Sequence, residues 1–488
     1  MRLKLITALI LLAVAVMPAD AQSMTSASGA PQAPGVAGSP VPSSSGTAAS
    51  AGQNPYLGGV PTGKLQPGTI PLSITDAIDR GLKYNLGVLL AGEGTRDARG
   101  ERWKALSRLL PNVSAGAAES SQQVNLAAYG FSGFPGMPTI VGPFSVFDTR
   151  AYLSQTILDF NALGRTREQT EKARAAEYTY QNARDVVVLV CANLYLQSVA
   201  DASRVKAAET QVKTAQALYD RAADLKKAGV VPGIDVLRAQ VELQAQQQRL
   251  IYYRNEFAKQ KLSLARAIGL PIGQEFKLTD TIPYAAMPLI PLEKAMDQAF
   301  TTRSDYRAAQ AQVKAAEAAK RAARGDGLPS LHFDSNYGDI GNAPGRSHGT
   351  FSVAATLRIP IFEGGRVHGE VMQADARLKQ RRAELEDLRA RIAYEVQSAL
   401  LDLKSSGDRV QVAKSAQQLA TEELQQAQDR FSAGVVSSIE VVQAQDALAT
   451  ADENYISSLY TYNVAKASLA RALGISEKAY KQFIGGEQ

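Results

Sequence analysis

The chain has 488 residues, which is too long for one ordinary hydrophobic core. Its formal net charge of +6 is small for this length, and no cluster of lysines and arginines resembles a phosphate-binding surface, so we expect no nucleic-acid partner. The single cysteine, Cys191, excludes an intramolecular disulfide framework, and the apolar run around it indicates a buried, unreactive thiol.

The N-terminal residues predict an exported protein. Arg2 and Lys4 precede an apolar run over residues 5–17, and the Ala-Asp-Ala sequence that ends at Ala21 has the small residues of a cleavage site. We therefore predict a signal peptide over residues 1–21. The residue directly after the cleavage site is not a cysteine, which argues against a lipid anchor at a new N-terminus.

The next segment, residues 22–70, is rich in Ser, Gly, Ala and Pro, and Lys64 is its only charged residue. Such a composition buries too little apolar surface to offset the entropy lost on ordering. We predict a flexible linker over this whole segment.

The remainder of the chain is predicted to form two related halves, residues 71–275 and 276–488. The matching segments are LSITDAIDRGL at 72–82 with PLEKAMDQAF at 291–300, Leu110-Pro111 with Leu328-Pro329, and LARA at 264–267 with LARA at 469–472. Repetition of so large a unit predicts two structurally equivalent halves. Each half is predicted to run helix, two strands, a very long helix, a turn and a return helix.

Each half contains one very long predicted helix. Neither Pro nor Gly occurs from Arg165 to Ala228, and 64 helical residues would span about 96 Å. In the second copy, residues 366–433, apolar positions follow the spacing of a coiled-coil seam with one stutter. These positions are Val367, Val371, Ala374, Leu378, Leu385, Leu388, Ile392, Val396, Ala399 and Leu403. On spacing alone the expectation is a long solvated helical hairpin, and no uninterrupted apolar run reaches the about 20 residues of a spanning helix.

The predicted strands alternate between apolar and polar side chains. Residues 351–361, FSVAATLRIPI, place apolar side chains on one face, and residues 330–338, SLHFDSNYG, alternate in the same way. This pattern suits a transmembrane barrel, and it equally suits an ordinary half-buried sheet. Four strands per chain cannot close a barrel, so strands that cross a membrane would require oligomerisation: two copies give eight strands and three give twelve.

The two long helices end in nearly identical turns. Residues 228–240 are AGVVPGIDVLRAQ, and residues 433–445 are AGVVSSIEVVQAQ. In each turn a glycine can stop the helix, and two valines follow it. An acid, Asp235 or Glu440, lies six residues after the glycine, where the helix dipole also favours a negative charge. The turns are therefore compatible with plain helix ends or with apolar docking tips.

These features together resemble the TolC family of outer membrane efflux proteins. The resemblance rests on the signal peptide, the duplicated unit, IPIFEGGR at 359–366 after the last strand and the twin turns, and it covers roughly residues 72–472. It implies a mainly α fold with a membrane β-barrel part. The implied assembly is a homotrimer in outer-membrane lipid, with a twelve-stranded barrel of four strands per protomer and an α-helical coiled-coil tunnel in the periplasm.

The resemblance also implies partners and site residues. The expected partners are a periplasmic adaptor and an inner-membrane transporter of an efflux pump or a type I secretion system. The implied adaptor-contact tips are Gly229, Val230, Val231, Pro232, Gly434, Val435, Val436 and Ser437, and the implied gate and selectivity residues are Glu440, Gln443, Asp235 and Arg238. The family has a second acid at the position of Gln443, and a latch arginine at the position of Val436. We therefore expect one acidic ring, and a closing network built from other residues.

Nothing in the sequence indicates an enzyme, a cofactor or a metal site. The three histidines, His332, His348 and His368, are scattered over a strand, a loop and a helix start, and no phosphate-binding or nucleophile motif is present. Two alternatives stay open: a soluble periplasmic coiled-coil scaffold or adaptor, and a lytic or adhesive surface protein. The sequence does not indicate the transported substrate.

Overall fold

The computed structural model describes residues 54–131, 136, 138–281, 284–288 and 290–483. The predicted signal peptide and residues 22–53 of the predicted linker lie outside the described residues. The described chain forms one compact unit within residues Gln53–Gln488.

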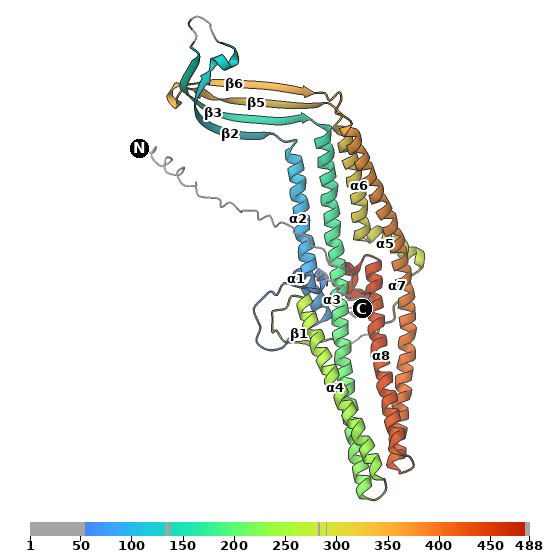
Figure 1. The fold of residues 1–488 in the computed structure, drawn as a ribbon. Coiled ribbons are helices and arrows are strands. Elements are labelled where there is room, and N and C mark those ends of the chain that lie inside the picture. Colours follow the sequence, from blue (N-terminus) through green and yellow to red (C-terminus); the bar gives the residue numbers. More distant parts are fainter. Residues whose placement is uncertain (1–53, 132–135, 137, 282–283, 289, 484–488) are drawn as a thin grey trace, which may run out of the picture. The chain divides into compact units, whose positions relative to one another are not determined.

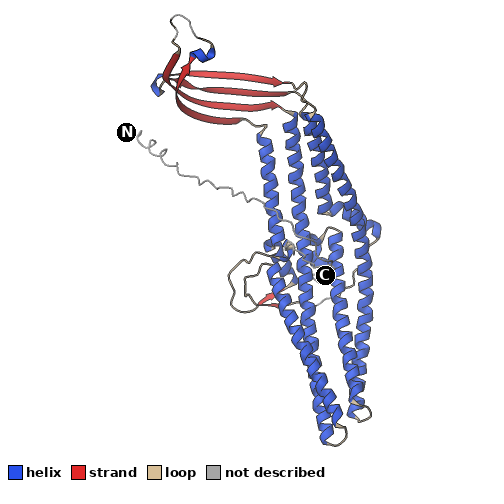
Figure 2. Cartoon of the chain, in the orientation of Figure 1, coloured by secondary structure: helices blue, strands red, loops and turns tan. Residues whose placement is uncertain are grey.

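Apart from η1 at the start and α9 at the end, the described elements occur in the same order twice (Figures 1 and 2). The first series is η1 (Pro55–Leu57), β1 (Ile70–Leu72), α1 (Ile74–Tyr84), α2 (Leu86–Ser107), β2 (Asn112–Asn125), η2 (Leu126–Tyr129), β3 (Ile140–Leu158), α3 (Phe160–Lys227) and α4 (Gly233–Ala267). The second series is β4 (Phe276–Leu278), α5 (Leu292–Thr302), α6 (Ser304–Gly325), β5 (Ser330–Gly341), η3 (Pro344–Arg346), β6 (Ser347–Arg358), α7 (Arg366–Ser432), α8 (Ser438–Ala472) and α9 (Ser476–Phe483). Corresponding helices have nearly equal lengths, for example 68 residues in α3 and 67 in α7.

The long helices pack through the predicted coiled-coil seam. All of the seam positions named for α7 are buried or half-buried, and Ile392 and Val396 are fully buried. In the lower part of Figure 1 the helices lie in the order α4, α3, α8, α7, and neighbouring helices in that order are in contact. The helical hairpins α3–α4 and α7–α8 therefore lie side by side, with α4 and α7 at the outside.

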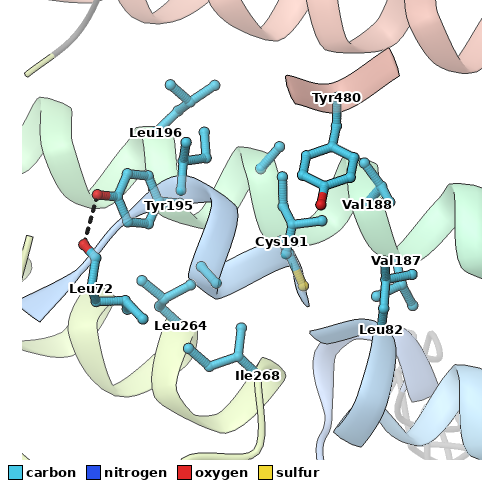
Figure 3. Packing of buried hydrophobic residues seen from close by; sticks show 14 of the residues in the cluster. Leu72, Leu82, Val187, Val188, Cys191, Tyr195, Leu196, Leu264, Ile268 and Tyr480 are labelled. Carbon is cyan, nitrogen blue, oxygen red and sulfur yellow. Dashed lines mark hydrogen bonds between the residues drawn. The ribbon is translucent and has the colours of Figure 1, made fainter. Parts of the chain in front are cut away.

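One segment of α3 is more apolar than the sequence analysis recognised. By length and composition alone, α3 contains an 18-residue window that could cross a membrane, and 56% of that window is buried inside the protein. Val187, Val188 and Cys191 of α3 pack there against α1 and α4 (Figure 3). Burial raises the pKa of the Cys191 thiol to about 12, which agrees with the predicted unreactive thiol.

The predicted linker is wrong in its last part. From Asn54 the chain lies against α1, α2 and the end of α4. The Val60 N–H donates to the Tyr84 carbonyl at 2.9 Å, and the Arg80 guanidinium donates to the Thr62 carbonyl at 2.8 Å. A Cβ at Gly87 would lie 2.3 Å from the ring of Tyr56, so this glycine makes room for the aromatic side chain. Composition did not show these contacts because they rely on one tyrosine and on backbone groups.

The four long strands form one antiparallel sheet in the order β2-β3-β5-β6. Its register pairs Tyr337 with Phe351 and Leu331 with Leu357 on one face, and Asn336 with both Tyr152 and Ser352 on the other. In β5 and β6 the predicted alternation is therefore confirmed, although β6 ends at Arg358 and not at the predicted Ile361. Strands β2 and β6 are the two edges of this sheet.

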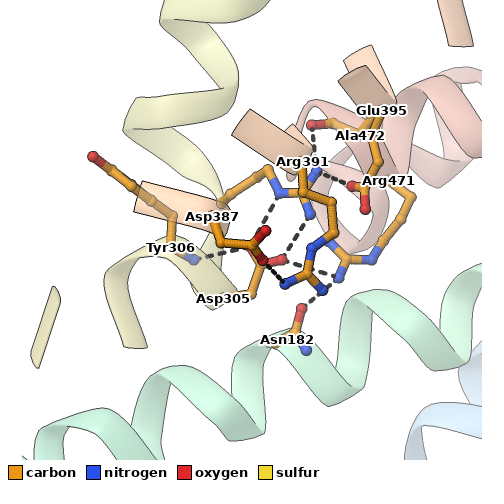
Figure 4. A network of polar contacts seen from close by, with 9 residues as sticks. Asn182, Asp305, Tyr306, Asp387, Arg391, Glu395, Arg471 and Ala472 are labelled. Atoms are coloured by element: carbon orange, nitrogen blue, oxygen red, sulfur yellow. Dashed lines mark hydrogen bonds and ion pairs between the residues drawn. The ribbon is translucent and has the colours of Figure 1, made fainter. Parts of the chain in front are cut away.

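A buried ion network joins four helices between the sheet and the turns (Figure 4). Arg303, only 2% exposed, contacts Asp305 at 2.7 Å and Glu395 of α7 at 2.5 Å, and it donates to the Ala472 carbonyl of α8 at 3.4 Å. Arg471 of α8 lies 3.8 Å from Asp305. Burial alone would raise the pKa of Asp305, but the hydrogen bonds and charge of Arg303, together with the charge of Arg471, hold it below its ordinary value.

This network generates a prediction about stability. Replacing Arg303→Met should lower the unfolding free energy by about 3 kcal/mol, because the half-buried Asp305 carboxylate loses its nearer cation and keeps only Arg471 at 3.8 Å. Thermal unfolding of the purified protein, followed by circular dichroism, measures the loss. Folding lowers the pKa of Asp305, so its ionised carboxylate adds to the free energy of unfolding. This contribution is complete above the unfolded pKa of about 3.9, and it disappears as the pH falls through the folded pKa. In an Asp305→Asn variant, the free energy of unfolding should therefore fall less on acidification than in the wild type.

The matched control is Arg382→Gln. Arg382 pairs with Glu317 at 2.8 Å, and both side chains are exposed, so the change should cost no more than about 1 kcal/mol. Equal losses in the Arg303 and Arg382 variants would contradict a stabilising role of the buried network.

Candidate functional site

The turns between α3 and α4 and between α7 and α8 have the same backbone geometry. In the first, the N–H of Gly229 donates to the carbonyl three residues back at 3.0 Å, and that of Val230 to the carbonyl five residues back at 2.9 Å. Gly434 and Val435 make the same two bonds in the second turn, each at 3.0 Å. Both glycines have positive φ, 75° and 72°, which other residues rarely adopt. Each long helix thus ends in a Schellman motif.

The first valine of each turn is exposed and the second is half-buried. Val230 and Val435 are 58% and 70% exposed. Val436 packs against an apolar cluster of the two hairpins, which contains Leu218, Ala222, Ala239, Leu424, Ala427, Phe431, Val441 and Ala444. A Cβ at Gly434 would lie 4.0 Å from the Cγ1 of Val230, so the two turns are direct neighbours. The adjacent turns therefore form one surface with two exposed apolar side chains.

Asp235 does not face solvent. It is 5% exposed, and its Oδ1 accepts a 2.7 Å hydrogen bond from the fully buried Ser438 hydroxyl of the other hairpin. Arg238 lies one turn further along α4, with its guanidinium 3.5 Å from the same oxygen. Asp235 thus links the two hairpins inside the protomer. Asp235 and Arg238 were predicted as gate residues, and the contact of Asp235 with Ser438 was not predicted.

Glu440 is half-buried and has a partner of its own. The Arg430 guanidinium of α7 lies 2.5 Å from the Glu440 carboxylate, with 56% and 40% of the two side chains exposed. An ion pair this exposed stabilises by only about 0–1 kcal/mol. Arg430 was missed because it precedes the turn by four residues while Glu440 follows it by six. Only the closed hairpin brings the last turn of α7 against the first turn of α8.

The two turns therefore carry corresponding acids in different surroundings. Asp235 is buried beside Ser438, whereas Glu440 is partly exposed beside Arg430. Of the other predicted residues, Pro232, Ser437 and Gln443 are exposed and Val231 is half-buried. The arrangement offers solvent an apolar pair of valines and a weak ion pair, which suit docking and electrostatic selection rather than catalysis.

The described residues show no grouping of His, Cys, Asp and Glu that could hold a metal ion. The three histidines lie apart, His332 on β5, His348 on β6 and His368 on α7. The turns hold no histidine, and the Ser438 hydroxyl beside Asp235 is fully buried.

Comparison with known proteins gives a consistent result. The family model described as outer membrane efflux protein matches residues 95–270 and again residues 295–475. The chain is 24% identical over 376 residues to the probable efflux pump outer membrane protein TtgC of Pseudomonas putida, covering 75% of each chain. It is 20% identical over 353 residues to the alkaline protease secretion protein AprF of Pseudomonas aeruginosa, covering 69% of this chain and 72% of AprF. The crystal structure of the CmeC outer membrane channel of Campylobacter jejuni has a similar fold, with a TM-score of 0.73, 18% identity, and coverage of 87% of this chain and 92% of CmeC.

The contact between the hairpins generates a second prediction. Replacing Ser438→Ala should cost about 1–3 kcal/mol in local opening of the turns, because it removes the closest hydrogen-bond donor from a buried carboxylate. Hydrogen exchange of the backbone amides in residues 233–246 and 438–449 measures this opening. Ser437→Ala is the control, since Ser437 is exposed and its side chain makes no cap bond to the helix. Equal exchange in the two variants would contradict a link through Asp235.

Proposed function

Because the chain belongs to the outer membrane efflux protein family, we propose that three copies of it close into one export duct. The chain is an outer-membrane channel component of an export system and is not an enzyme. It resides in the outer membrane, with its helices extending into the periplasm. The proposal concerns how copies assemble, where the duct narrows and what the turns bind.

The edges of the sheet support closure by several copies. Lipid offers no hydrogen bonds, so strands β2 and β6 cannot be left as open edges in a membrane. Strand β6 of one copy can pair antiparallel with β2 of the next, which continues the observed order. Two copies would give eight strands, and the interior of such a barrel is filled by side chains. Three copies give a twelve-stranded barrel with a polar interior, which leaves room for a duct.

The outer helices support the same arrangement. Both α4 and α7 carry exposed large apolar side chains along their length. On α4 these are Ile234, Leu237, Val241, Ile251, Tyr252 and Leu262, and on α7 they are Met372, Tyr394, Leu401, Val412 and Leu419. Apolar stripes on two opposite edges indicate a head-to-tail contact between copies, which closes a ring.

The two stripes match in height. Counted from Pro232 and Ser432 at the two turns, Tyr252 and Val412 each lie twenty residues into their helix, or about 30 Å. Val412 borders a cavity of about 830 Å³ between α7 and α8, and small serine and alanine side chains line much of it. Tyr252 of a neighbouring copy is the side chain that we expect to fill this cavity.

We assign the narrow end of the duct to the turns. Three Glu440 side chains would form one acidic ring that attracts cations, and Gln443 one turn later adds no charge. Arg430 takes the place of the absent latch arginine and holds each Glu440 by an exposed ion pair. Asp235 and Arg238 are assigned to holding the two hairpins together rather than to the ring.

The exposed turns are the proposed adaptor-contact surface. Val230 and Val435 offer a periplasmic adaptor two apolar side chains on adjacent turns. An inner-membrane transporter of an efflux pump or a type I secretion system supplies the energy, and the duct itself is passive. The single observation that carries the proposal is the four-stranded sheet with two open edges, in which β5 and β6 place their apolar side chains on one face. A soluble periplasmic scaffold would not require such a face.

Channel recordings test the proposed duct. Purified protein in a planar bilayer should form stable cation-preferring channels, and Glu440→Gln should reduce the preference for K⁺ over Cl⁻. Arg430→Gln should increase both the conductance and the cation preference, because it frees the Glu440 carboxylates. Folded protein that forms no channels would support the soluble scaffold instead. Channels in which both variants behave like the wild type would exclude Glu440 from the narrow end.

Disulfide trapping tests the proposed neighbour contact. A Tyr252→Cys/Val412→Cys variant should form covalent dimers and trimers on mild oxidation, because the two positions meet between copies. The native Cys191 is fully buried and should not interfere. In the control Tyr252→Cys/Glu423→Cys, the second cysteine lies eleven residues nearer the turn, about 16 Å away along α7. Equal yields in the two variants, or none in either, would contradict the proposed packing.

A further inference from the structure

A cavity of about 730 Å³ opens on the helical layer next to the sheet. Its wall includes residues of α2, α3, α6 and α7, which follow one another across the layer, each in contact with the next. One cavity can touch four successive helices only on the concave side of their layer. In a closed ring of such layers, the concave side is the interior. The inference below rests on the proposed function in this one respect.

The floor of this cavity is made of alanines. They are Ala91 of α2, Ala175 and Ala176 of α3, Ala315, Ala316, Ala319 and Ala323 of α6, and Ala374 of α7. On α3 the lining extends from Arg165 to Thr179, fourteen residues, or about 21 Å. The cavity is therefore a long trough with a smooth apolar floor. Its volume falls within the about 300–1,000 Å³ of sites that bind drug-sized molecules.

The walls of the trough carry more positive than negative charge. The lining cations are Arg165, Lys172, Arg377 and Arg381, and the lining acids are Glu168, Glu370 and Glu384. Glu168 is buried and serves two of these cations, Arg165 at 3.1 Å and Lys172 at 2.7 Å. Asp326 and Glu370 also interact electrostatically with Arg165, so this wall carries little excess charge.

The opposite wall, on α7, carries a positive charge that no acid pairs with. Glu384 pairs with Arg381 at 2.7 Å, and Glu370 pairs with Arg366, outside the lining, at 2.7 Å. Among the residues that the structure describes, Arg377 has no hydrogen-bond or ion-pair partner. It is exposed, and it lies on the wall of α7 beside the alanine floor. The lining residues of each chain thus leave one positive charge in excess, and the unpaired Arg377 on α7 carries it.

We infer that this trough is a transit site for amphipathic organic anions. A flat ring system or a short acyl chain would lie on the alanine floor, and a carboxylate, sulfonate or phosphate group would be held by Arg377 from one side and by Lys172 from the other. Guanidinium and ammonium groups form charge-assisted hydrogen bonds with such anions. A shallow, open trough binds weakly, which suits a molecule in passage.

The acidic ring assigned to the turns does not cancel the binding of anions in the trough. From Arg377 to the end of α7 at Ser432 there are 55 residues, or about 82 Å. Screening at physiological salt acts over about 8 Å. Cation attraction at the turns and anion binding in the trough are therefore electrostatically independent.

Current block tests the inference. The probe is 1-naphthalenesulfonate, added on the side of the bilayer where the barrel opens, so that it reaches the trough without passing the turns. It should block the wild-type channel, and neutral 1-naphthalenemethanol at the same concentration should not. Arg377→Gln should weaken the block about tenfold, through loss of one charge-assisted hydrogen bond. Ala319→Leu, which fills the floor and leaves every charge in place, should also weaken it.

The matched control is Arg382→Gln. Arg382 lies on α7 five residues further along, pairs with Glu317 and does not line the trough, so its loss should leave the block unchanged. A conducting wild type that the sulfonate does not block, or an equal effect of the Arg377 and Arg382 changes, would overturn the transit site while leaving the duct intact.

Direct titration separates the two proposals. Binding of naphthalenesulfonate to protein in lipid nanodiscs can be followed by the fluorescence of the probe. Arg377→Gln should weaken this binding, as it weakens the current block. Binding that depends on Arg377 in protein that does not conduct would support the site and contradict the duct. Conducting protein without such binding would contradict the site alone.

Discussion

The close packing of α6 against α3 is the contact on which the arrangement of the chain depends. A Cβ at Gly164 would lie 2.6 Å from Ala322, and a Cβ at Gly325 would lie 2.6 Å from the backbone of Phe160, so only glycine fits at these two positions, both at the sheet end of the contact. The Asn161 side chain also donates to the Ala322 carbonyl at 3.1 Å. This approach brings the ends of β3 and β5 together, and the pairing of these two strands joins the hairpin β2–β3 to the hairpin β5–β6. Other alanines of α6, among them Ala315 and Ala319, line the trough beside this contact.

The two turns show how one backbone geometry supports different chemistry. Their glycines, capping hydrogen bonds and helix lengths correspond, but one acid is buried under a serine hydroxyl and the other is exposed beside an arginine. The residue that corresponds to Arg430 in the first turn is Leu225, and the residue that corresponds to Ser438 is Gly233. Asp235 therefore has no counterpart of Arg430, and Glu440 has no counterpart of the Ser438 hydroxyl. In a ring of three copies, hairpins of the two kinds would alternate, and only one kind would present a titratable acid with a weak, exposed partner.

Much of the fold could be predicted from the sequence because it depends on local periodicity. The spacing from Val367 to Leu403 identified the buried side of α7, and the alternation from Phe351 to Arg358 identified the two faces of β6. The glycines of the turns were identified because a positive φ limits the choice of residue. In each case the signal lies within one element, where a period of 3.6 or 2 residues determines which side chains share a face.

The contacts that were missed connect elements far apart in the chain or separated by a turn. Arg430 and Glu440 meet only across the closed hairpin, and Asp235 and Ser438 are 203 residues apart. The trough was not predicted because its alanines and cations belong to four helices, and none of these helices shows it alone. The segment after Asn54 was assigned to a linker because its composition is polar and glycine-rich, while its order depends on backbone hydrogen bonds to α1 and α4.

The strength of the contacts decreases from the middle of the helical region towards the turns, and this gradient determines which part can move. In the middle, Arg303 and Asp305 form a buried network that is costly to break, and the apolar clusters of both halves lie around it. At the turns a smaller cluster and one buried hydrogen bond hold the hairpins together, and the Arg430–Glu440 pair is exposed to solvent. Local opening uses the least stable contacts first. Motion that separates the turns, the proposed narrow end, can therefore occur while the Arg303 network, the sheet and the trough keep their shape.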